Sequence, residues 1–385
     1  MKKKIAKYMT VIVFLLMIFP IAIINFTKPA TKFSESENRY LKTKITFSFD
    51  DLINGKLANN VEDYLTDQFV ARDFFMATKL QADYAIGKRE NKNVMYGQDG
   101  QLFLKIGNPS KETIDFNTKT LEDFAKQNEK LLGKDHVATA IIPSAIEILK
   151  DKMPKYATDF DQIKLISDVK NTVKSGKFID VTKTLTDHKN EDIYFKTDHH
   201  WTTYGAFLGY EKYCQDMNIK ANKIDDFNRK VITEQFYGTN YSKAHTNATP
   251  YDKIEEFSLK TPQKFTVQFN SEKEIHNGLF FPEWLEKRDK YSYFLNTVCG
   301  KTKITSENKN GKKLLLVGDS YSRSFATMLA PSFEEIYLVD LRFYNEDVQK
   351  LIKTEGITDS LTMFYANGFV EDKNVAKLAP KAAKK

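Results

Sequence analysis

KLLLVGDSYSRSF, residues 313–325, is the most informative segment of this chain. Its apolar run, Leu314–Val317, is short and aliphatic, which predicts a strand buried on both faces. The run stops at Gly318-Asp319-Ser320, and the residues after it, Tyr321–Leu329, have the apolar spacing of a helix. Ser320 then lies at a strand-to-helix turn, where its hydroxyl stands above the carboxyl edge of the sheet. Backbone N–H groups at the start of the helix face any oxyanion that forms there.

A second stretch, Thr197–Trp201 (TDHHW), supplies what a serine nucleophile needs, which is a base and a carboxylate that orients it. Asp198 and His200 are two residues apart and face the same way in an extended segment. The carboxylate would hold one imidazole nitrogen while the other faces Ser320. This spacing favours His200 over His199 as the base, with His199 as an orienting or packing residue.

A metal-ligand pair and a polar loop pinned by a buried Trp201 are the alternative interpretations of this stretch. Adjacent histidines on a strand point to opposite sides, which makes chelation by both awkward. No cluster of Cys or Glu nearby completes a zinc set. The sequence therefore predicts no metal site and no cofactor.

The paired motifs, DHHW at 198–201 and GDSYS at 318–322, resemble the DHHW family of extracytoplasmic proteins. That family is similar to the alginate O-acetyltransferases of the SGNH-hydrolase type, and the resemblance runs from about Glu37 to Phe369. It implies an SGNH-like α/β fold, a Ser-His-Asp triad and acyl transfer to a surface polysaccharide, with a membrane-bound O-acyltransferase as acyl supplier. Carried over by position, Ser320 matches the nucleophile, His200 the base and Asp198 its orienting group.

Other residues are predicted to support or line the site. Asn367, just past a predicted strand end, resembles the third conserved block of SGNH enzymes, where the side chain helps to hold the oxyanion; a plain turn asparagine is the alternative. Gly318 and Asp319 are expected to support the same turn. The candidate substrate contacts are His199, Trp201 and Tyr321, together with Lys243 and His245 for an anionic glycan.

Strands alternate with helices along much of the chain, which predicts a mostly parallel sheet with helices on both faces. The expected domain spans 51–372, contains a β-rich insertion at about 218–309, and is followed by a solvated Lys/Ala-rich tail, 373–385. Predicted strands are His136–Pro143, Phe178–Val181, Glu335–Asp340 and Ser360–Tyr365, with a hairpin over Val94–Leu104. Predicted helices are Asp50–Gly87, Thr113–Leu132, Tyr156–Ser175 and one from Thr202 or Thr203 to Met217.

Residues 1–26 predict a membrane anchor. Four lysines precede an apolar run, Met9–Phe26, which as a helix is roughly 27 Å long and so just spans a bilayer core. The lysines stay in the cytoplasm, which puts a stalk at 27–50 and the catalytic domain outside the cell membrane. A cleaved signal peptide is the alternative, but the run is longer than most signal-peptide cores and no clear A-x-A site follows it.

The composition and net charge limit the classes of partner that the protein is expected to bind. The 385 residues have the apolar and charged fractions of a globular protein, and the net charge is +7. The charge agrees either with general solubility or with attraction to a polyanionic envelope, whereas no basic stripe interleaved with aromatics indicates a nucleic-acid site. Cys214 and Cys299 are the only cysteines, and the sequence leaves open whether they pair.

Together these features predict an extracytoplasmic O-acyltransferase, with acetyl as the expected group, that modifies a cell-envelope or secreted polysaccharide through an acyl-serine intermediate. Two alternatives remain open. One is a carbohydrate esterase with the same triad. The other is an inactive, membrane-anchored protein that binds glycan or acts as a scaffold.

Overall fold

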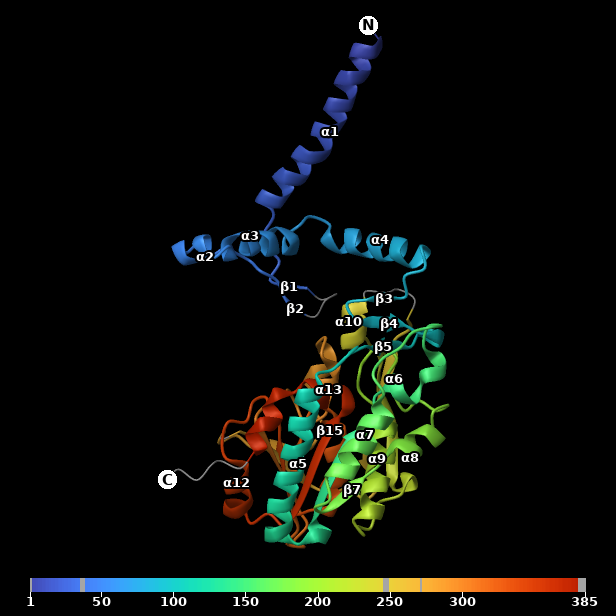
Figure 1. Ribbon diagram of the computed structural model, residues 1–385, viewed down its shortest axis with the longest axis vertical. Helices are drawn as coiled ribbons and strands as arrows, with labels where there is room; N and C mark the ends of the chain where they lie inside the picture. The colour runs from blue at the N-terminus through green and yellow to red at the C-terminus, as the bar shows by residue number, and fades with distance from the viewer. Residues whose placement is uncertain (1, 35–38, 245–248, 271, 380–385) are drawn as a thin grey trace. The chain divides into compact units, whose positions relative to one another are not determined.

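The chain forms two compact units, Met1–Lys88 and Arg89–Lys385 (Figure 1). The computed structural model describes residues 2–34, 39–244, 249–270 and 272–379. Two residues that the sequence analysis singled out, Glu37 and His245, lie outside these ranges.

The first unit begins with one long apolar helix, α1 (Lys2–Thr27). Its segment Tyr8–Asn25 has a mean hydropathy of 2.4 and is long and apolar enough to cross a membrane, a property that a signal sequence shares. The predicted helical region from Asp50 follows. Its elements are α2 (Phe49–Ile53), α3 (Lys56–Asp67) and α4 (Arg72–Ala85), after a short ladder of β1 (Phe33–Ser34) and β2 (Arg39–Tyr40).

The second unit is built on a mixed sheet whose strand order is β11-β10-β12-β14-β13-β15-β6-β7. Neighbours from β14 to β7 run parallel, as predicted, and β12, β10 and β11 continue the sheet in antiparallel fashion. The strands are β6 (Val137–Ile142), β7 (Lys177–Ile179), β10 (Phe265–Phe269), β11 (His276–Asn277), β12 (Lys301–Ser306), β13 (Lys313–Gly318), β14 (Glu335–Val339) and β15 (Asp359–Tyr365).

Strand β13 lies at the centre of this sheet, and helices cover both of its faces. Leu314 and Leu316 belong to one hydrophobic cluster, whereas Leu315 and Val317 belong to the other. Each fully buried side chain of this size stabilises the fold by roughly 2 kcal/mol. The first cluster includes residues of α6 (Ala145–Ile148), α8 (Thr182–Asp187), α9 (Thr203–Asp216) and α11 (Tyr321–Leu329); the second includes residues of α5 (Lys111–Leu132), α7 (Gln162–Thr172), α12 (Val348–Glu355) and α13 (Ala366–Glu371).

Smaller β elements lie beside the main sheet. The predicted hairpin is present in a three-stranded sheet of β3 (Glu90–Asn91), β4 (Val94–Tyr96) and β5 (Leu102–Leu104). Residues 218–309 are β-rich, as expected, and the structure divides them. The long pair β8 (Phe227–Phe236) and β9 (Asp252–Leu259) forms its own ladder, with α10 (Thr239–Ala244) between the two strands, while β10 and β12 join the main sheet.

The helix predicted over Tyr156–Ser175 is shorter than expected. Tyr156 has a φ of 66°, a left-handed backbone that ends any right-handed helix, and α7 begins only at Gln162. Asp161 caps it by accepting a hydrogen bond of 2.8 Å from the N–H of Lys164. Residues 156–161 therefore form a connection rather than a helical turn.

The predicted solvated tail was wrong for its first part. Lys373–Leu378 forms a 3₁₀ helix, and Val375 and Leu378 are buried in the hydrophobic cluster beneath α5. Alanine and lysine dominate this stretch, so its two apolar anchors were too few to show a periodic pattern.

The two cysteines remain free thiols. Cys214 is buried in α9 and Cys299 is half-buried. Burial raises the pKa of the Cys214 thiol to about 12, which makes it an unreactive core residue.

Replacing Gly205 in the first turn of α9 by alanine should destabilise the second unit. A Cβ there would overlap the carbonyl oxygen of Ile193, a backbone atom that accepts a hydrogen bond from Thr202. We expect the free energy of unfolding of the full chain in detergent to fall by about 1–3 kcal/mol. Gln215→Ala, on the exposed face of the same helix, should change it by less than about 0.5 kcal/mol. Equal denaturation midpoints for the two variants would contradict this packing.

Candidate active site

Ser320 is the N-cap of α11 and follows the end of β13 after one intervening residue. The turn is so tight that a Cβ at Gly318 would overlap Met363 O on the neighbouring strand and Ser322 Oγ on the helix. Only glycine fits at this position. The sequence prediction of a strand, a sharp turn and a helix therefore holds in detail.

Asp319 ties this turn to the adjacent strand. Its Oδ1 accepts a hydrogen bond of 2.9 Å from the N–H of Tyr321, and its Oδ2 accepts one of 2.8 Å from the N–H of Tyr365. Burial raises the pKa of the carboxyl to about 7, although these two bonds act against the rise. Asp319 thus joins the turn to β15, and its supporting role in catalysis stays a prediction.

Residues 197–200 form a bend between Tyr194 and Trp201, which pair as an antiparallel bridge. In the bend, Asp198 Oδ1 lies 2.5 Å from His200 Nδ1. On the other side of the ring, His200 Nε2 lies 2.7 Å from the Ser320 Oγ. The structure thus brings the three predicted catalytic residues into one hydrogen-bonded chain, although through a bend and not the extended segment that the sequence suggested.

The second oxygen of Asp198 is held by Thr239, at the start of α10. Oδ2 accepts 2.7 Å and 2.8 Å bonds from the Thr239 N–H and hydroxyl. The carboxylate is 3% exposed. Burial alone would raise its pKa, but the two neighbouring histidines and these donors outweigh burial and hold the pKa well below the usual range. A Cβ on Gly238 would overlap the carboxylate, so glycine is required there too.

The imidazole of His200 lies between two other rings. Tyr291 stacks on it with a centroid distance of 3.8 Å and an interplanar angle of 10°, and its hydroxyl bonds to the Ser324 Oγ at 3.0 Å. The His199 ring is 3.9 Å away, and its Nδ1 lies 2.7 Å from the Thr239 hydroxyl. Burial and the adjacent His200 lower the pKa of His199 to about 3, so this ring is neutral at physiological pH.

Sequence reasoning missed Thr239 and Tyr291. Thr239 follows a Phe-Tyr-Gly run that reads only as a turn, and Tyr291 is one of 19 tyrosines. Neither position carries a local signal of contact with residues 198–200. Their roles arise from packing between segments that are far apart in the chain.

Trp201 and Tyr321 were wrong as substrate contacts because both are fully buried. The Trp201 Nε1–H donates to Tyr321 O at 3.2 Å and to the Ser324 Oγ at 3.1 Å, and the Tyr321 hydroxyl donates to His199 O. These bonds fasten the bend to α11. His199 is partly exposed and Lys243 is exposed, so their contact with substrate stays a prediction.

Asn367 belongs to a buried network at the ends of three strands. Its Oδ1 accepts bonds from the Ser144 hydroxyl at 3.1 Å and from Gln162 Nε2 at 2.9 Å, and its Nδ2 donates to Leu104 O at 3.1 Å. One of the two amide N–H groups is therefore committed to Leu104. A role for the other at an oxyanion stays a prediction.

The argument from the sequence against a metal was partly wrong. Because the segment bends, Asp198, His199 and His200 offer ligand atoms that all lie within 4.8 Å of one another. The candidate ligand atoms of Asp198 and His200 are, however, already hydrogen-bonded to each other, and His199 Nδ1 is bonded to Thr239. A metal at this place would have to replace these bonds.

The family model described as DHHW protein matches residues 114–339, which is more than half of the chain. The chain belongs to the DHHW family. No curated protein sequence matches this DHHW protein.

The DHHW family protein from Eubacterium siraeum and Bacillus cereus PatB1 share its fold, whereas Pseudomonas putida AlgJ is a weaker match. A DHHW family protein from Eubacterium siraeum is 22% identical, with a TM-score of 0.62 over 75% of this chain and 99% of its own. Bacillus cereus PatB1, solved with a sulfonyl adduct, is 19% identical, with a TM-score of 0.62 over 74% and 100%. The O-acetyltransferase domain of Pseudomonas putida AlgJ is 12% identical, with a TM-score of 0.45 over 74% and 98%.

Separate alanine variants of the two histidines should differ in the reactivity of Ser320. We expect phenylmethylsulfonyl fluoride to label Ser320. His200→Ala should slow labelling by about 10²- to 10⁴-fold, because His200 Nε2 is the hydrogen-bond partner placed to take the hydroxyl proton. His199→Ala should cost about tenfold or less. Intact-protein mass spectrometry of the full chain measures the rates. If only His199→Ala lost labelling of Ser320, His199 and not His200 would be the base. Loss of labelling after chelation by EDTA would favour a metal site.

The raised pKa of Asp319 predicts a pH dependence of stability. The folded state binds the proton of Asp319 more tightly than the unfolded chain does. The protonated carboxyl therefore contributes to the free energy of unfolding at low pH, and this contribution is lost as the pH rises through about 7. Between about pH 4 and pH 8 the free energy of unfolding of the wild type should fall, relative to that of Asp319→Asn, by on the order of a few kcal/mol. Denaturant titrations of both proteins across this range measure the difference. Parallel profiles would mean that Asp319 does not titrate on folding.

Proposed function

We propose that this DHHW protein is an extracytoplasmic O-acyltransferase that moves an acyl group, with acetyl as the expected one, through Ser320 onto a polysaccharide hydroxyl. The observation that carries the proposal is the continuous chain Asp198–His200–Ser320, with contacts of 2.5 Å and 2.7 Å. A buried, ionised carboxylate behind an imidazole fixes the tautomer that can accept the serine proton.

In the first half-reaction, Ser320 Oγ attacks the carbonyl carbon of the donor ester while its proton passes to His200 Nε2. The carbonyl π electrons move to oxygen and form a tetrahedral oxyanion. When this intermediate collapses, the donor's alkoxide leaves and takes the proton back from His200. Asp198 stabilises the imidazolium in between without accepting its proton.

The oxyanion forms at the N-terminus of α11, where the positive end of the helix dipole favours negative charge. The backbone N–H of Ser320 is the proposed donor there. The second candidate is the Asn367 amide, through the N–H that does not bond to Leu104 O. Gly318 and Asp319 fix the turn that aims the Ser320 N–H.

In the second half-reaction, His200 takes the proton of a sugar hydroxyl, whose oxygen attacks the acyl carbon. The acyl–Oγ bond then breaks, and Ser320 recovers its proton from His200. If water takes the place of the sugar, the protein is an esterase. The outcome depends on whether the acceptor is positioned better than water.

The comparisons support this proposal at the level of the fold. PatB1 was solved with a sulfonyl adduct, and sulfonyl reagents react with activated hydroxyls of the kind proposed for Ser320. The resemblance of the two motifs to the alginate O-acetyltransferases supports acyl transfer to a polysaccharide.

Helix α1 supports a location at the cell membrane. With its lysine-rich start in the cytoplasm, an uncleaved α1 anchors the chain and leaves the catalytic unit outside. Acyl donors are made inside the cell, so a donor must cross the bilayer. A membrane-bound O-acyltransferase is the proposed partner that delivers it.

The test is acylation of the full chain in detergent by p-nitrophenyl acetate, followed by intact-protein mass spectrometry with and without an oligosaccharide acceptor. We expect an acetyl adduct on Ser320, discharged at least about tenfold faster by the sugar than by water. Ser320→Ala should form none.

Two other results would overturn the proposal. Discharge at the same rate with and without acceptor would identify an esterase. No adduct in the wild type, with unchanged glycan binding by Ser320→Ala, would favour a scaffold or glycan-binding protein.

A further inference from the structure

Two exposed aromatic residues, each next to a cation, lie beyond the carboxyl edge of the parallel strands. Phe343, after β14, is 53% exposed and lies 5.6 Å from the guanidinium of Arg342. Tyr156, in the connection after β6 and α6, is 88% exposed and lies 5.0 Å from the ammonium of Lys155. Single exposed apolar side chains are common on soluble proteins. Here, however, each of the two aromatic rings also has a cation near its face, which is a more specific arrangement.

The strands that precede these two pairs lie on opposite sides of β13, the strand that leads to Ser320. The strand order β14-β13-β15-β6 puts the ends of β14 and β6 three strand spacings apart, which is roughly 14 Å. The four strands are parallel, so their carboxyl ends share one edge, with Ser320 after β13 between them. Ligands of open α/β sheets bind along this edge.

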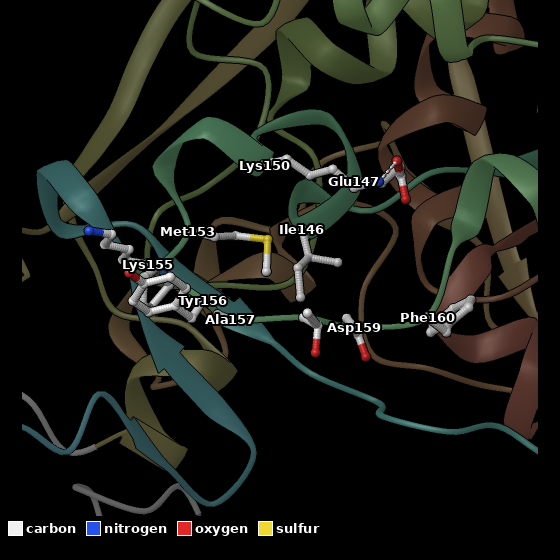
Figure 2. Close-up of a pocket in the computed structure, with 11 residues that line it drawn as sticks. Ile146, Glu147, Lys150, Met153, Lys155, Tyr156, Ala157, Asp159 and Phe160 are labelled. Carbon is white, nitrogen blue, oxygen red and sulfur yellow. Dashed lines mark ion pairs between the residues drawn. The ribbon is translucent and has the colours of Figure 1, made fainter.

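Tyr156 borders a cavity of about 450 Å³. Figure 2 shows Ile146 and Met153 pointing into this space, with Lys155 and Tyr156 together on one side and Phe160 on the other. An apolar floor beside an exposed ring suits the C–H face of a sugar, because aromatic faces attract C–H groups. The left-handed backbone of Tyr156 (φ 66°) is a local strain of the kind that is concentrated at binding sites.

The charges around the cavity leave one cation available. Glu147 pairs with Lys150 and accepts the N–H of Gln162, and Asp159 accepts the N–H groups of Ile106 and Gly107. Lys155 is exposed and has no ion-pair partner among the side chains that the structure describes. The cavity therefore presents a positive group beside its aromatic wall.

The cation of the other pair is already in an ion pair. Arg342 makes a two-bond ion pair with Asp340, at 2.9 Å and 2.6 Å, which holds its guanidinium in place. Burial is the main cause of the lowered pKa of His199, and the positive charges of Lys243 and Arg342 add to it. The charges of Lys243 and Arg342 therefore act on the active-site residue His199.

We propose that the carboxyl edge from Phe343 to Tyr156 is an extended binding site for an anionic glycan, whose chain crosses Ser320. Sugar rings stack on the two aromatic side chains, and carboxylate or phosphate groups of the glycan pair with Lys155 and Lys243. The inference rests on the proposed function, because it names the class of acceptor for the same serine. Binding of the glycan on both sides of the acyl group would hold a sugar hydroxyl in place, which explains why the sugar and not water attacks the acyl-serine.

The test is calorimetric titration of the full chain in detergent, carrying Ser320→Ala so that no chemistry occurs. The probes are an oligogalacturonate, which carries carboxylates, and a neutral malto-oligosaccharide of equal length. We expect the acidic oligomer to bind at least about tenfold more tightly than the neutral one. The affinity for the acidic oligomer should fall by about fivefold or more in each of three variants, Tyr156→Ala, Lys155→Gln and Phe343→Ala. Lys312→Gln, an exposed lysine at the amino end of β13, is the matched control and should bind as the parent does.

Equal affinity for the two oligomers, or wild-type affinity in Tyr156→Ala and Phe343→Ala, would overturn the inference. These outcomes are separable from failure of the proposed function. Acylation of Ser320 by p-nitrophenyl acetate is measured on the wild type without any glycan, so a normal adduct together with unaltered glycan binding in the variants would refute only the extended site.

Discussion

The arrangement of the site depends on the buried carboxylate of Asp198. A charge removed from water is tolerable only when hydrogen bonds replace its hydration, and leaving one unpaired costs several kcal/mol. Here the two oxygens receive donors from the bend itself, through His200, and from Thr239 at the start of α10. The same bonds that keep Asp198 ionised therefore join two segments 41 residues apart and fix the imidazole that faces Ser320.

The rest of the molecule makes that geometry rigid. Strand β13 is buried on both faces, and Asp319 fastens its end to β15, so the position of Ser320 follows from the sheet. Trp201 attaches the bend to α11 through its indole N–H. Tyr291 and the neutral His199 then hold the two faces of the His200 ring. A site supported by packed, hydrogen-bonded neighbours keeps the short distances that proton transfer requires.

Local patterns were sufficient for much of the fold. An aliphatic run that ends at Gly-Asp-Ser predicted β13, the turn and α11, because the apolar period and the need for glycine act over a few residues. The same reasoning failed where the backbone broke the pattern. Tyr156 adopts a left-handed conformation inside a stretch of helical spacing, and residues 197–200 bend where alternation suggested an extended segment. Trp201 and Tyr321 were assigned to the substrate because burial is decided by distant partners, not by adjacent motif residues.

Residue types and spacing along the chain were enough to predict which side chains could form the site, the parallel direction of the central strands and the apolar N-terminal helix. These depend on residue type and on short-range periodicity, which can be read along the chain. Three contacts became visible only in the folded chain: Thr239 binds the second oxygen of Asp198, Tyr291 stacks on His200, and Asn367 bonds to Ser144 and Leu104. Such contacts depend on packing between residues separated by up to 263 positions, and no local pattern encodes which distant side chain fills a given space.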